Sequence, residues 1–175
     1  MLSQIETIDT GFKMEQIVLK ATLGDKILES LGWLTLFLLW CLIFVNYNKL
    51  PAIIPVHYNT LGKADNFGGK ETILFLPVIA TVIFIGMTIL TRFPHIFNYP
   101  VKITEDNAFR QYTDACRLIR YLKFIIVVIF GIITFKTIPN TAGTSDGLGA
   151  WFLPVTLGCI AIPVIYYVVQ SFRRV

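Results

Sequence analysis

The sequence predicts an all-α integral membrane protein with four transmembrane helices and an ordered extracytoplasmic loop between helices one and two. Of its 175 residues, 55% are hydrophobic and only 15% are charged, whereas charged residues make up about 25% of an average soluble domain. The hydrophobic residues form long blocks rather than short amphipathic runs. Basic residues flank these blocks, so the net charge of +4 reflects membrane topology, and we expect no nucleic-acid partner.

The chain divides into three parts. Residues 1–30 form a cytoplasmic N-terminal segment, in which apolar side chains scattered among charges from Lys13 to Ser30 favour an interfacial helix. Residues 31–138 form the main membrane domain, and residues 139–175 form a short outer loop, a fourth span and a basic C-terminus. A helix needs about 20 residues to cross the hydrocarbon layer, and four apolar blocks approach this length. The expected spans are residues 31–47, 72–91, 121–138 and 151–169.

Two spans have features that change how they cross the bilayer. The apolar centre of the third span is short, and we expect Lys123 and Lys136 at its ends to extend their ammonium groups toward water. The fourth span contains Pro154 and Pro163, which predict a kinked or interrupted helix.

A further helix is expected from Thr104 to Leu122, continuous with the third span. Thr104 is a suitable N-cap, and Glu105 and Asp106 suit the positive end of the helix dipole. One face repeats apolar residues at three- and four-residue spacing. These residues are Phe109, Tyr112, Ala115, Cys116 and Ile119.

The basic residues predict the orientation. Four spans place both termini on one side, together with the loop between spans two and three. That side carries Lys13, Lys20, Lys26, Arg92, Lys102, Arg110, Arg117, Arg120, Lys123, Arg173 and Arg174. The other side carries Lys49, Lys63, Lys70 and Lys136. The positive-inside rule therefore places both termini in the cytoplasm, with the basic segments against membrane lipid.

The loop from Asn46 to Glu71 carries the most chemical information. Pro51 and Pro55, four residues apart, hold the chain extended. Alternation along a strand then places His57 and Asn59 on the same side, and Gly62 permits a tight turn. Asp65 and Lys70, which follow the turn, can then converge with His57 and Asn59. The residues expected to bind a partner or to shape this loop are His57, Asn59, Asp65, Lys70, Pro51, Pro55 and Gly62.

The same loop resembles a known family. Its residues follow the pattern LPxxIPxHxNxxGxxDxxGxK from Leu50 to Lys70. This pattern is similar to the membrane domain of unknown function shared with the immunity protein of the bacterial sporulation-delaying-protein toxin system. A second stretch with the family's character combines 98–100, Asn-Tyr-Pro, with 103–107, Ile-Thr-Glu-Asp-Asn. The resemblance covers roughly residues 31–122 and implies a place in the cytoplasmic (inner) membrane of a bacterial cell.

The resemblance implies a non-catalytic protein: an immunity-like or accessory subunit that binds a membrane-active peptide or another membrane protein through its outward loop and span mouths. A bland alternative is that the polar residues only stabilise the loop's own fold. A membrane-embedded enzyme is another, with His57 as general base, Asp65 orienting it and Lys70 as electrophile or phosphate clamp. No nucleophile motif accompanies these residues, so we expect no enzyme.

A small transporter and a metal site are weaker alternatives. Transporters place ionisable residues inside their spans, and here only Lys123 and Lys136 lie at span ends, although the prolines of the fourth span leave room for a backbone site. The loop has one strong nitrogen ligand for a metal, and Cys41, Cys116 and Cys159 lack metal-binding spacing. We therefore expect no metal and no cofactor.

Overall fold

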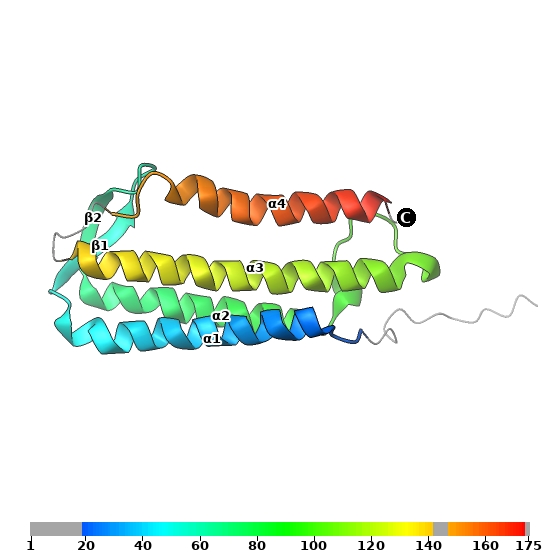
Figure 1. Ribbon diagram of the computed structural model, residues 1–175, viewed down its shortest axis with the longest axis horizontal. Coiled ribbons are helices and arrows are strands. Elements are labelled where there is room, and N and C mark those ends of the chain that lie inside the picture. Colours follow the sequence, from blue (N-terminus) through cyan, green and yellow to red (C-terminus); the bar gives the residue numbers. More distant parts are fainter. Residues whose placement is uncertain (1–18, 142–146, 174–175) are drawn as a thin grey trace, which may run out of the picture.

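The computed structural model describes residues 19–141 and 147–173, which form four long apolar helices able to span a membrane and a small two-stranded hairpin between the first two. The main elements are α1 (Leu23–Asn46), β1 (Ile53–Tyr58), β2 (Ala64–Gly69), α2 (Phe75–Leu90), α3 (Glu105–Asn140) and α4 (Phe152–Arg173). Short 3-10 helices are η2 (Tyr47–Lys49), η3 (Lys70–Leu74) and η4 (Pro94–Ile96). The four helices run side by side, and the hairpin lies at one end of them, which we call the hairpin end (Figure 1). The start of α1 and the end of α4 lie at the other, the termini end (Figure 1).

Helix α1 begins earlier than the sequence suggested. Thr22 and Asp25 form a capping box, in which the Thr22 hydroxyl accepts from the Asp25 backbone N–H and the Asp25 carboxylate accepts from the Thr22 backbone N–H. Because this cap fixes the first helical residue at Leu23, residues 23–30 are the opening turns of the first span rather than part of a separate interfacial helix. Of the rest of that predicted helix, residues 19–22 are not helical, and residues 13–18 lie outside the described residues.

The core is built by α1, α2 and α3. Its members are apolar side chains from the three helices and from the hairpin region: Leu36, Leu39, Ile43, Leu50, Ile54, Ile73, Ala80, Phe84 and Val127. Gly32 lets α1 approach α2 closely, since a Cβ at this position would lie 2.6 Å from the Phe84 ring. Trp33 packs edge-on against the same ring, with 4.8 Å between ring centroids. These contacts fix the register of α1 against α2.

Helix α3 confirms the predicted continuous helix, with Thr104 as its N-cap in a capping box with Asn107. At 1.5 Å per residue its 36 residues extend for about 54 Å, far longer than the hydrocarbon layer. One predicted face residue was wrong: Phe109 is exposed, and Ala108 is buried in its place with Tyr112, Ala115 and Cys116. The inner face of the helix therefore runs through Ala108, Tyr112, Ala115 and Cys116, and Phe109 lies outside it.

Helix α4 is a single uninterrupted helix, so of the predicted kink or interruption the structure contradicts the interruption. Pro154 lies in its first turn, where no backbone N–H is required, and only Pro163 stands inside the helix. Among the described residues of α4 only Ser171 is buried. Its hydroxyl donates to the Gln111 side-chain oxygen at 2.7 Å, and Gln111 donates back to the Ser171 carbonyl at 3.0 Å. This pair ties the end of α4 to α3.

Candidate functional site at the hairpin end

The predicted ordered loop is an antiparallel hairpin. Its register runs from Ile53 opposite Gly69 to Tyr58 opposite Ala64, with irregular pairing around His57. Pro51 lies just before β1, and Pro55 lies within it opposite Phe67. Pro55 therefore acts as the sequence suggested, by keeping the backbone extended within the first strand, whereas Pro51 lies outside the strand, before a bend at Ala52.

His57 and Asp65 meet across the two strands. The His57 Nδ1 lies 2.5 Å from the Asp65 Oδ1, and the side chains remain 64% and 41% exposed. A carboxylate on one ring nitrogen orients the imidazole and leaves the other nitrogen free to face a ligand. Solvent reaches this pair, so its contribution to the stability of the hairpin is small, roughly 1 kcal/mol or less.

Asn59 and Gly62 build the turn between the strands. The Asn59 side-chain oxygen accepts the backbone N–H groups of Leu61 at 3.0 Å and Lys63 at 3.1 Å. The Gly62 N–H donates to the Asn59 carbonyl at 2.8 Å, and Gly62 has a φ of +74°, in the left-handed region that favours glycine. These contacts make Asn59 a turn-forming residue whose amide is committed to the backbone.

Lys70 does not join the other polar residues. Its ammonium group lies 4.9 Å from the centroid of the Tyr47 ring, in a cation–π contact at the start of η3. The expected convergence of four polar side chains therefore reduces to the His57–Asp65 pair, with Asn59 in the turn and Lys70 at the base of the hairpin. Strand alternation could predict the side of the hairpin on which His57 lies. It could not predict where Lys70 lies, because this residue follows β2, at the start of η3.

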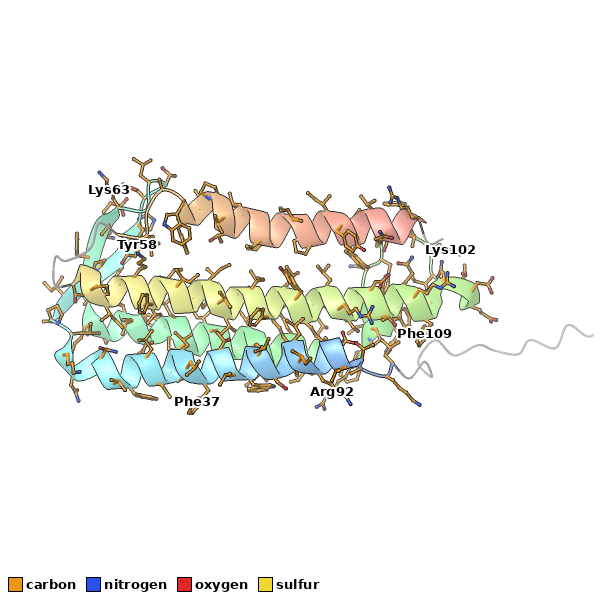
Figure 2. The ribbon with its side chains drawn as sticks, in the orientation of Figure 1. Phe37, Tyr58, Lys63, Arg92, Lys102 and Phe109 are labelled. Atoms are coloured by element: carbon orange, nitrogen blue, oxygen red, sulfur yellow. The ribbon has the colours of Figure 1, made fainter. Side chains whose placement is uncertain are left out.

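Hydrogen bonds join the hairpin to the end of α3 and to the segment that precedes α4. The Leu148 N–H donates to the Gly62 carbonyl at 2.7 Å, and the Tyr58 and Thr137 hydroxyls lie 2.8 Å apart. Figure 2 shows Tyr58 between the hairpin and the end of α3. These two ties place the turn over the mouth of the bundle.

A cavity of about 540 Å³ lies between the hairpin, the start of α2 and the ends of α3 and α4. Most of its lining is apolar, including Ile54, Phe75 and Phe152, while His57 and Thr137 supply polar groups. The hairpin also exposes large apolar side chains, namely Ile53, Val56, Leu61 and Phe67, of which Val56 also lines the cavity. A mostly apolar cavity with a few polar groups is the usual form of a ligand site.

Sequence reasoning missed a buried ion pair at the other end of the bundle. Lys123 does not extend to water: it is 1% exposed, and its ammonium group donates to Glu29 at 2.7 Å and to the Thr88 hydroxyl at 2.6 Å. The pair joins α1 to α3 beside α2. The signal was present as charges in matched spacing, with Asp25 and Glu29 four residues apart on α1 and Arg120 and Lys123 three apart on α3.

Within residues 19–141 and 147–173, no three His, Cys, Asp or Glu side chains lie together as metal ligands. Cys41, Cys116 and Cys159 are free thiols. The chemistry that the hairpin end offers is thus an oriented imidazole beside an amphipathic cavity.

Part of this site matches a known family model. Residues 34–81 match the model of a Domain of unknown function (DUF1648). The chain is also similar to an uncharacterized protein from Archaeoglobus fulgidus, with 25% identity over 111 residues that cover 59% of this chain and 61% of that protein. No solved structure matches. Residues 34–81 contain the second half of α1, the whole hairpin and the first part of α2. The hairpin with its His57–Asp65 pair therefore lies within the part of this multi-pass membrane protein that matches the domain of unknown function, whereas the cavity is also lined by residues of α3 and α4.

Proposed function

We propose that this protein is a non-catalytic, immunity-like or accessory membrane protein that binds a membrane-active peptide or another membrane protein at its hairpin end. The observation that carries the proposal is the amphipathic cavity of about 540 Å³ beneath a hairpin that exposes Ile53, Val56, Leu61 and Phe67. A partner with an apolar face can cover these side chains and insert a residue into the cavity.

The energy of such binding would come mainly from apolar burial. Large apolar side chains that pass from half exposed to buried contribute on the order of 1 kcal/mol each, and the hairpin exposes four of them. The exposed His57–Asp65 pair contributes less, roughly 1 kcal/mol or below. We therefore assign affinity to the apolar side chains and orientation of the partner to the polar pair.

The best-supported alternative is a membrane-embedded enzyme. The His57–Asp65 pair is the arrangement of an oriented general base, and His57 lines the cavity. The two functions separate on substitution. If the protein is an enzyme, His57→Gln should abolish turnover without releasing a bound partner. If it is a binding protein, Val56→Asp should release the partner although His57 is unchanged.

Site-specific photo-crosslinking in cells tests the proposal. A benzophenone amino acid at Phe67, on the hairpin, is compared with the same group at Phe37, on the outer face of α1 (Figure 2). The two positions are matched controls, since they are 59% and 63% exposed. We expect one discrete peptide or protein adduct at position 67, lost in Val56→Asp, and only lipid adducts at position 37. Lipid adducts alone at both positions would exclude a retained partner at the hairpin.

A further inference from the structure

A second cavity lies at the termini end, far from the hairpin. Its volume is about 820 Å³, and it lies between the start of α1, the end of α2 and the segment that leads into η4. Basic and acidic side chains line it together: Lys26, Arg92 and Arg120 with Asp25 and Glu29. We call it the termini-end cavity.

The acidic side chains of this cavity already have cationic partners. Asp25 lies 3.4 Å from the Arg117 Nε and 3.7 Å from an Arg120 guanidinium nitrogen, and Glu29 accepts from Lys123 at 2.7 Å. Three cationic side chains therefore line the cavity with two carboxylates, and Arg117 and Lys123 reach those carboxylates from outside the lining. Across residues 19–141 and 147–173, the Lys26 and Arg92 side chains have no assigned hydrogen bond or ion pair, and both are exposed. This surplus of positive charge favours an anion.

A groove on α1 continues from the cavity. It has a volume of about 370 Å³ and is lined by Leu23, Lys26, Ile27, Ser30, Leu31 and Leu34. Lys26 and Ser30 line both hollows, so the two are contiguous. The remaining lining residues are apolar and recur at three- and four-residue spacing, so the groove runs along the helix toward the middle of the apolar span.

We propose that an anionic phospholipid binds here, with its phosphate in the termini-end cavity and one acyl chain along the α1 groove. Lys26 and Arg92 would contact the phosphate, while Arg120, only 17% exposed, forms the wall behind it. Figure 2 shows Arg92 at the termini end, where a headgroup at the membrane surface would lie. Charge selects the headgroup and the groove selects a chain, so a soluble phosphate would satisfy only half of the site.

Lipid retention measured by native mass spectrometry tests the charge. The full chain, delipidated in a neutral detergent, is offered phosphatidylglycerol or phosphatidylcholine with the same acyl chains. Each basic group near an anionic lipid contributes several-fold, so we expect Lys26→Ala/Arg92→Ala to reduce phosphatidylglycerol occupancy about twenty-fold, to the level of phosphatidylcholine. The matched control, Lys102→Ala/Arg110→Ala, removes two exposed charges at the same end outside the cavity and should change occupancy less than about twofold. Equal losses in the two double variants, or no preference for phosphatidylglycerol, would overturn the site.

The groove is tested separately. Ile27→Trp should fill it and lower retention of phosphatidylglycerol, whereas Ile162→Trp, at an exposed position on α4, should not. Glycerol phosphate added at the same concentration as the lipid should fail to displace it. Displacement by glycerol phosphate, with no effect of Ile27→Trp, would identify a site for soluble phosphates and reject the phospholipid.

Discussion

At the scale of single residues, Lys123 has the most demanding environment in the bundle. Its ammonium group is enclosed by α1, α2 and α3, with Glu29 and Thr88 as acceptors and the Phe84 ring 4.4 Å away. Burial of two charges costs free energy that their attraction only partly offsets, but loss of one partner leaves the other uncompensated. Glu29 remains 28% exposed and can turn to water, whereas Lys123 cannot. The two partners are therefore not equivalent.

This asymmetry gives the first prediction. Glu29→Leu strands the Lys123 charge and should lower the free energy of unfolding by about 3 kcal/mol. Lys123→Met leaves a carboxylate that water can reach and should cost about 1 kcal/mol. The double variant should recover most of the loss in Glu29→Leu, because no charge is then buried. Unfolding in mixed detergent micelles, followed by Trp fluorescence, measures all three, and a double variant as unstable as Glu29→Leu would show that packing rather than charge holds this junction.

The candidate site was only partly predictable from the sequence. The pairing of His57 with Asp65 could be predicted because alternation in a strand and a glycine turn relate nearby positions. The contact between Lys70 and Tyr47 could not, since it depends on how η2 and η3 meet after the hairpin closes. Lys123 was assigned to water because its helix was considered alone. Its partner lies 94 residues away in sequence, and only helix packing brings the two to one depth.

At the scale of elements, the hairpin is stabilised by its contact with the connection between α3 and α4. The backbones of Gly62 and Gly149 approach so closely that a Cβ on Gly62 would lie 2.5 Å from the Gly149 carbonyl oxygen. The four spans could be predicted because apolar blocks of about 20 residues have few other uses. This backbone contact could not, because glycine in a loop signals a turn but does not name the segment that packs against it.

Gly62→Ala tests that contact. The substitution places a side chain at positive φ and against a backbone that cannot move aside, so we expect a local destabilisation of at least 1–2 kcal/mol, roughly ten-fold faster hydrogen exchange at the Leu148 amide. Gly86→Ala is the matched control, because a Cβ there meets nothing within 4 Å and alanine favours helix α2. If exchange at Leu148 is unchanged in Gly62→Ala, the hairpin is not held by this connection.

At the scale of the whole molecule, the two ends of the bundle differ in chemistry. The hairpin end combines an apolar cavity with an exposed His57–Asp65 pair, and the termini end combines a basic cavity with a buried ion pair. Four parallel or antiparallel spans of this length separate the two ends by the thickness of a bilayer. A peptide partner at the hairpin and a phospholipid at the termini end would therefore be met on opposite sides of the membrane.

The distribution of basic residues predicts which side is which, and cysteine labelling in intact cells tests it. In a chain with Cys41, Cys116 and Cys159 replaced by alanine, Lys63→Cys reports on the hairpin end and Lys102→Cys on the termini end (Figure 2). An impermeant maleimide should modify Lys63→Cys at once and Lys102→Cys only after the membrane is opened, because the side richer in Lys and Arg stays in the cytoplasm. The reverse order would place the hairpin in the cytoplasm, where an external membrane-active peptide could not reach Phe67, and the partner would then have to be a protein of the cell itself.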